Sequence, residues 1–312
     1  MKQLYLIAIL SIMFLIQDLN AQCCSMGNPL AGSTYSTDAV KGQFQLNAYY
    51  KHGYNETYFR KNVRLVNYGI YSHSGYDFTG LALSYSVTNR LTIEHENGYY
   101  LKKEVRYLNP EIDALVVNGY GLSNGLLGFR YLIFGGKPGA FNISAGGGVK
   151  YPYSTEMFTY ENVELPIELQ PSTRAWGVMA QIFMSKDISR FKLNISHRSE
   201  FNQRNKDEYL YGDMHTSAVS VSGKIFKNFF AQLGVRNEFK LSDKTPTNAK
   251  LASEGSNMVI VAPKIGYQLP AGFHVSVFAD VPAYKYYFGE QLSMQYAVGI
   301  SIAKSFNLLK KS

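Results

Sequence analysis

The stretch from Met294 to Phe306, MQYAVGISIAKSF, decides the fold. Side chains that follow one another along an extended strand point to opposite faces of the sheet. One face of this stretch is apolar with aromatic ends and carries Tyr296, Val298, Ile300, Ile302 and Phe306. The other face is small and weakly polar and carries Ala297, Gly299, Ser301 and Ala303. Because this pattern recurs about a dozen times along the chain, we interpret it as a sheet closed on itself, with its apolar face in lipid.

About twelve strands are expected between residues 40 and 306, which we assign to one all-β, antiparallel up-and-down transmembrane barrel. They are residues 42–51, 77–87, 91–100, 125–134, 141–151, 174–185, 191–200, 214–226, 229–240, 258–269, 273–284 and 294–306. Short turns alternate with long connections, at about residues 52–75, 101–118, 152–173, 201–213, 241–257 and 285–292. This layout is typical of bacterial outer-membrane barrels. A soluble β-sandwich is the alternative, but it does not explain the apolar face on every strand.

The N-terminus carries the one long apolar run of the sequence, Leu4 to Ile16, preceded by Lys2. The run is too short for a comfortable transmembrane helix, and Ala21 offers a small residue at a suitable cleavage position. We therefore expect residues 1–21 to be a signal peptide, with a retained membrane anchor as the alternative. Residues 22–39 follow as an aperiodic periplasmic segment, and residues 307–312 form a short C-terminal tail.

Cys23 and Cys24 are adjacent near the start of the periplasmic segment. Two thiolates could bind a soft metal or take part in redox chemistry, although a tetrahedral metal site needs more ligands. Lipid attachment at Cys23 would need a small residue just before it, whereas Gln22 stands there. A disulfide-type role also stays open. We name both cysteines as metal candidates and expect no cofactor.

The twofold period of the strands places their charges opposite the apolar face, inside the barrel. The candidate lumen residues are Glu94, Glu96, Arg130, Lys150, Lys192, Arg198, Arg236, Glu238, Lys264 and Asp280, together with Glu200, Lys224 and Lys240. A charge facing lipid near the midplane would cost about 2–4 kcal/mol, which favours this frame. The charges could pair and hold the wall together, or they could line a narrow conduit that slightly favours anions, and the two interpretations are compatible because a paired lumen can also conduct. In the second case the field would come from Arg130, Arg198, Arg236 and Lys264.

The formal net charge of the chain is +8. Basic proteins often bind nucleic acid, but the expected secretion and the absence of a Lys/Arg-rich stretch argue against nucleic acid here. A basic lumen, or loops in contact with anionic lipopolysaccharide, fits the charge better. The expected partners are therefore outer-membrane lipid, lipopolysaccharide, the barrel assembly machinery and a small solute.

His197 and Ser199 are two residues apart on an expected strand, so they share a face, which is the lipid face in this frame. Outer-membrane phospholipases and lipid A deacylases resemble this, with a His-x-Ser-Asn core on the outer wall of a barrel. Here Glu200 replaces the Asn, and no third member follows at an obvious position. We therefore expect no enzyme. A hydrogen bond between His197 and Ser199 on the outer face would favour a lipid hydrolase.

Several segments resemble those of one protein family. They are Leu122-Ser123-Asn124-Gly125, Tyr209-Leu210-Tyr211-Gly212-Asp213, Pro282-Ala283-Tyr284 and Gly289-Glu290-Gln291-Leu292, before a terminal strand that ends in Phe306. Together they resemble the outer-membrane barrel family named after the phenol meta-cleavage pathway, over roughly residues 40–306. The resemblance implies a transporter, with hydrophobic compounds as one substrate class, and carries over no catalytic residue. Asn124 departs from the Asp of that family. The end of the signal peptide and the Tyr-rich strands resemble exported proteins of Bacteroidetes.

The sequence thus predicts a monomeric outer-membrane barrel that passes or binds a small solute. Its mechanism would be passive, with lumen charges that bias entry and outer loops that act as a gate. The alternative is a binding or assembly barrel whose Cys23-Cys24 segment engages a metal or a periplasmic partner. A lipid hydrolase is the third candidate.

Overall fold

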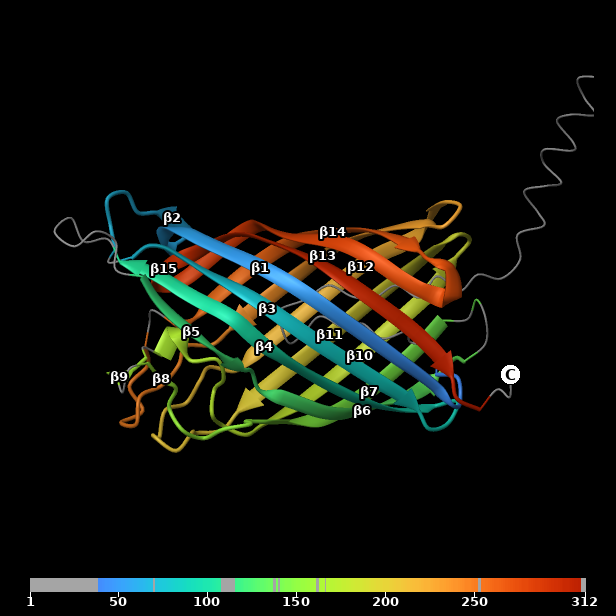
Figure 1. Ribbon diagram of the computed structural model, residues 1–312, viewed down its shortest axis with the longest axis horizontal. Helices are drawn as coiled ribbons and strands as arrows, with labels where there is room; N and C mark the ends of the chain where they lie inside the picture. Colours follow the sequence, from blue (N-terminus) through green and yellow to red (C-terminus); the bar gives the residue numbers. More distant parts are fainter. Residues whose placement is uncertain are drawn as a thin grey trace, which may run out of the picture.

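The structure is a computed structural model that describes residues 39–309, apart from 70, 108–115, 137–138, 140, 161–162, 166 and 252–253. The predicted signal peptide and nearly all of the predicted periplasmic segment lie outside the described residues. The described chain forms a closed antiparallel barrel of long, tilted strands (Figure 1). In this part of the chain no helix is long and apolar enough to cross a membrane.

Among the described residues, eleven strands close the ring. In order round the wall they are β1 (Gln43–Lys61), β3 (Tyr71–Ser86), β4 (Leu91–Tyr107), β6 (Gly125–Phe134), β7 (Phe141–Tyr151), β10 (Gly177–Ile188), β11 (Phe191–Asn202), β12 (Met214–Phe226), β13 (Phe229–Lys240), β14 (Ser256–Gln268) and β15 (Phe273–Asn307). β15 then pairs with β1, with Gln43 opposite Asn307, which closes the barrel.

Four shorter strands and two 3-10 helices complete the described elements. β2 (Val63–Arg64) pairs with β1. β5 (Val116–Leu122) precedes β6 in the chain and pairs with the C-terminal part of β4, from Tyr99 to Arg106. β8 (Thr159–Tyr160) and β9 (Val163–Glu164) form a small separate sheet. The helices are η1 (Ile167–Leu169) and η3 (Pro270–Gly272).

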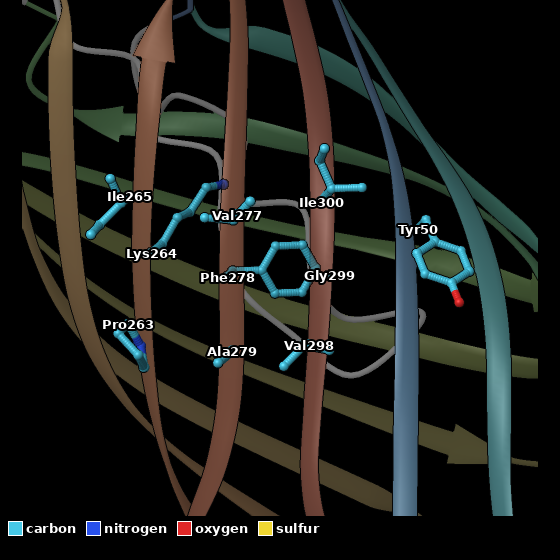
Figure 2. Close-up of a pocket in the computed structure, with 10 residues that line it drawn as sticks. All are labelled: Tyr50, Pro263, Lys264, Ile265, Val277, Phe278, Ala279, Val298, Gly299 and Ile300. Atoms are coloured by element: carbon cyan, nitrogen blue, oxygen red, sulfur yellow. The ribbon is translucent and has the colours of Figure 1, made fainter.

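β15 occupies two places in the wall. Its residues 273–287 pair with β14, whereas residues 287–307 pair with β1. The hydroxyls of Ser276 and Ser301 are 2.7 Å apart, although an extended run of that length would span about 80 Å. The element therefore folds back on itself, and Val277 and Val298 lie on adjacent runs (Figure 2). This agrees with the hairpin predicted from 273–284 and 294–306, and with an expected count of about twelve strands.

The strands extend further at the loop end than the sequence predicted. β1 continues to Lys61, β3 begins at Tyr71 and β4 continues to Tyr107. Most of the described residues in the expected loops 52–75, 101–118 and 285–292 are therefore strand, and that prediction was wrong. The physical reason is that ladder hydrogen bonds satisfy the backbone whatever the side-chain pattern, so strands can continue where lipid no longer imposes alternation. The strand expected at 174–185 begins instead at Gly177.

The two faces of the wall meet different surroundings, as predicted. On β6, Leu127 and Phe129 are each 48% exposed, whereas their neighbour Arg130 is 4% exposed. On β15, Val298 and Ile300 are exposed while Ala297 is buried. An exposed apolar belt round a closed ladder suits a hydrocarbon environment, because no backbone group is left unpaired at an edge.

The connection between β7 and β10 covers part of the loop end of the barrel. Leu165 and Leu169 pack against Val105 of β4 in a small buried cluster. The ammonium group of Lys103 donates to the carbonyl oxygen of Gln170 over 2.8 Å. These contacts attach β8, β9 and η1 to β4.

Candidate functional site

The lumen contains two clusters of paired charges. In the first, Arg198 of β11 donates to both carboxylate oxygens of Glu96 on β4, over 2.9 and 3.1 Å. β6, β7 and β10 separate these two strands along the wall. The pair therefore reaches across the interior and does not simply link neighbouring strands. Glu94 extends the cluster, since it accepts from Gln181 over 2.8 Å and lies 3.2 Å from Nε of Arg130.

Asp280 of β15 is the centre of the second cluster and is 0% exposed. Lys51 of β1 donates to it over 2.6 Å, and Arg236 of β13 donates to both of its oxygens over 3.2 and 3.3 Å. Nε of Arg236 also donates to Glu238 over 2.7 Å. Charge-assisted hydrogen bonds of this kind are the strong ones, so the cluster fixes the positions of β1, β13 and β15 relative to one another.

The remaining sequence-predicted lumen residues differ in burial and in ion-pair partner. Lys150 pairs with Glu200 over 3.3 Å, and both are buried. Lys264 is 2% exposed. Lys192 is 3.9 Å from Asp187 near the turn between β10 and β11. Of the ten principal candidates, Lys192 is the one outside the buried set of described residues. Their role toward a solute stays a prediction.

Within the described part of the barrel, the buried lumen charges nearly cancel. The cations are Lys51, Arg130, Lys150, Arg198, Arg236 and Lys264, and the carboxylates are Glu94, Glu96, Glu200, Glu238 and Asp280. A buried ion is tolerated only when it is paired and hydrogen-bonded. In this structure the lumen charges are paired, which is the first of the two interpretations left open by the sequence. A solute that crossed the barrel would have to pass the Arg198–Glu96 pair.

A hollow of about 630 Å³ lies at the loop end of the barrel. Tyrosines and carboxylates line it, among them Tyr58, Tyr68, Tyr71, Glu254 and Glu290. The hydroxyl of Tyr68 donates to Glu290, and this hydrogen bond raises the pKa of Tyr68. Apart from Glu290, which lies in one of the segments that carry the family resemblance, the sequence did not single out these residues, because they were assigned to loops without a periodic pattern.

A second hollow, of about 510 Å³, lies on the lipid side of the wall where β14, the two runs of β15 and β1 meet (Figure 2). Its lining is mainly apolar and includes five exposed residues, Pro263, Ile265, Val277, Val298 and Ile300. The pairing between β14 and β15 passes directly from Val261–Val281 to Lys264–Phe278. Proline has no N–H to donate, so Pro263 interrupts the ladder at this place.

His197 and Ser199 share the outer face of the wall, as predicted, and Nε2 of His197 is 3.0 Å from Oγ of Ser199. A third member that sequence reasoning missed is Ser217 of β12, whose Oγ is 2.8 Å from Nδ1 of His197. β12 was predicted, but its register against β11 was not, so nothing in the sequence aligned Ser217 with His197.

Cys23 and Cys24 lie outside the described residues. Within the described residues, no group of three or more His, Cys, Asp or Glu side chains is placed to hold a metal ion. The proposed metal or redox role of the two cysteines therefore stays a prediction.

No family model and no curated protein matches this sequence. Among solved structures, the chain is similar to the COG4313 outer membrane channel from Pseudomonas putida, with a TM-score of 0.67 and 11% identity over 87% of this chain and 98% of that one. It is less similar to the KdgM porin in complex with disordered oligogalacturonate, with a TM-score of 0.46 and 9% identity over 84% and 99% of the two chains.

At this level of identity the first comparison establishes the fold, which is that of an outer-membrane β-barrel. Together with the exposed apolar belt, it places the chain in an outer membrane. Contact with lipopolysaccharide and insertion by the barrel assembly machinery stay predictions.

Proposed function

We propose that this chain is an outer-membrane channel for a small solute, closed in the described state by the Arg198–Glu96 pair. The observation that carries the proposal is a transmembrane barrel whose interior holds buried ion pairs, one of which reaches across it from Arg198 of β11 to Glu96 of β4, so that its barrier is made of side chains. A barrier of side chains can open by a change of rotamer or by exchange of ion-pair partners, whereas a barrier of backbone cannot.

The hollow at the loop end supports an entrance on that side. Its tyrosine rings offer apolar surface and hydroxyl donors, and its two carboxylates offer acceptors. A small solute that enters there would next meet the lumen clusters. Because cations and carboxylates nearly balance in the lumen, selectivity would depend on the size and hydrogen bonding of the solute more than on its charge.

The test is the single-channel conductance of the purified, folded barrel in a planar bilayer. Wild-type protein should show rare or small openings. The double variant R198A/E96A removes both partners of the pair and should raise conductance several-fold. The matched control is K206A/E156A, because Lys206 and Glu156 form an exposed ion pair of 2.7 Å outside the lumen. A folded double variant that conducts no better than this control would contradict the channel.

A further inference from the structure

A chain of hydroxyl and imidazole groups runs across the outer face of β11 and β12. Oγ of Ser199 is 3.0 Å from Nε2 of His197 and 2.9 Å from Nδ1 of His215. Nδ1 of His197 is in turn 2.8 Å from Oγ of Ser217. Two antiparallel pairs create this arrangement, with His197 opposite Ser217 and Ser199 opposite His215.

This chain of groups faces lipid. Its neighbours on the same face, Ile195, Phe201 and Val219, are 40%, 42% and 47% exposed, whereas Arg198 and Glu200 alternate with Ser199 and point into the lumen. His215 is the second residue of β12, which follows directly on a loop. The groups therefore lie toward the loop end of the wall, where the ester groups of membrane lipids meet water.

One arrangement of protons satisfies all three contacts. The hydroxyl of Ser199 donates to Nε2 of His197, while Nδ1–H of His197 donates to Ser217. Nδ1–H of His215 donates to Oγ of Ser199. The ring of His215 also packs against Phe201 and Phe239, at centroid distances of 5.8 and 6.2 Å, which holds its orientation. A hydroxyl bound to a base, with the base oriented by a third group, is the arrangement that activates a serine nucleophile.

We propose that Ser199, His197 and Ser217 form a serine hydrolase centre for acyl esters of membrane lipids. His197 takes the proton of Ser199 as Oγ attacks the ester carbonyl carbon. The tetrahedral intermediate then expels the alcohol, which receives the proton from His197, and leaves an acyl group on Ser199. Water, deprotonated by His197, attacks that acyl group, releases a fatty acid and restores the hydroxyl of Ser199.

The surroundings define the substrate class and the supporting roles. Exposed Ile195, Phe201 and Val219 provide apolar surface for an acyl chain, which matches the lipid of the membrane better than a water-soluble ester. Nδ1–H of His215 can donate to the developing oxyanion. Ser217 binds His197 and, among the described residues, forms no hydrogen bond with Ser199, so it is a positioning residue. The sequence offered Glu200 after Ser199, and the fold supplies the missing member from β12 instead.

The experiment uses the full chain, purified from outer membranes in detergent, and a fluorophosphonate that labels activated serines. The substrates are mixed micelles of a diacyl phosphatidylcholine and, separately, purified lipopolysaccharide, with released fatty acid as the readout. Wild-type protein should be labelled at Ser199 and should hydrolyse at least one of the two. S199A and H197N should each reduce the rate about 100-fold or more. S196A, on the opposite face of β11, is the matched control and should keep the rate.

The role of Ser217 has its own readout. S217A should lower kcat about tenfold with little change in KM, because it affects only the orientation of the base. S217T restores a hydroxyl and should recover the rate. If folded wild-type protein is not labelled and releases no more fatty acid than S199A from either substrate, the centre is only a hydrogen-bonded polar patch in the wall and the proposal is wrong. That result would leave the channel proposal untouched, since conductance does not depend on Ser199.

Discussion

The two faces of β11 differ in the partners that their polar side chains bind. On the lumen face, Arg198 satisfies its charge through two hydrogen bonds to Glu96, a residue 102 positions away in the sequence. On the lipid face, Ser199 and His197 bind each other and the side chains of His215 and Ser217 on the neighbouring strand β12. The lumen can hold ions because it brings opposite charges together, whereas the polar groups on the lipid face of β11 are a hydroxyl and an imidazole that bind each other.

The largest expected effect comes from breaking the lumen pair on one side only. R198A leaves Glu96 buried without its bidentate partner, so the free energy of unfolding should fall by about 3–5 kcal/mol. R198A/E96A should lose less, because no ion is left behind. On the lipid face, S199A should cost about 1 kcal/mol, the net value of a neutral hydrogen bond.

Urea unfolding of the folded barrel in detergent measures all three variants. S196A serves as the control for removing a hydroxyl from the lumen face of the same strand. If R198A lowers the free energy of unfolding no more than S199A does, water must screen the lumen charges. The lumen would then already be open, and the proposed difference between the two faces would be wrong.

The sequence alone was sufficient to predict which side chains of a strand face the lumen and which face lipid, because this pattern repeats every two residues. The alternation around Arg198 and Ser199 predicted that one points into the lumen and the other toward lipid, and both are placed so. The hairpin turns at 88–90 and 227–228 followed from short polar stretches between apolar runs, and both are confirmed, the first beginning one residue earlier at Val87. These features depend on neighbours in the sequence, and neighbours are what a single sequence displays.

The pairings across the barrel could not be predicted in the same way. Whether Arg198 meets Glu96, or His197 meets Ser217, depends on the register of strands and on the curvature of the closed wall. A shift of one residue between β11 and β12 would move Ser217 to the opposite face from His197. The extent of β1, β3 and β4 beyond the membrane was also missed, since no lipid enforces alternation there.

A smaller effect is expected at the loop end, where a carboxylate is buried among mainly neutral donors. Asp243 is 1% exposed and accepts from the hydroxyl of Tyr209 and from the backbone N–H of Gly212, each over 2.8 Å. Lys240 lies 3.0 Å away. D243N keeps the shape but removes the charge, so it should lower the free energy of unfolding by about 2 kcal/mol.

The measurement is again urea unfolding, with N248A as a control on the same group of loops. A loss as large as that of R198A would mean that Lys240 behaves as a buried ion, like those of the lumen. A loss no larger than that of N248A would mean that water replaces the carboxylate, and the loop end would then resemble an ordinary surface.

The smallest expected effect is the pH dependence of this loop-end contact. Burial, and then the hydrogen bond to Asp243, raise the pKa of Tyr209 well above its ordinary value. Since the pKa is higher in the folded chain than in the unfolded one, the stabilisation is fully present below the unfolded value of about 10 and is lost progressively as pH rises from there through the folded value. Wild-type protein should therefore keep its higher urea midpoint over Y209F between pH 8 and about pH 10, and the difference should narrow only at higher pH. A difference that stays constant as pH rises above about 10 would show that folding leaves the pKa of Tyr209 unchanged, and the loop end would then belong with the solvent-exposed surface.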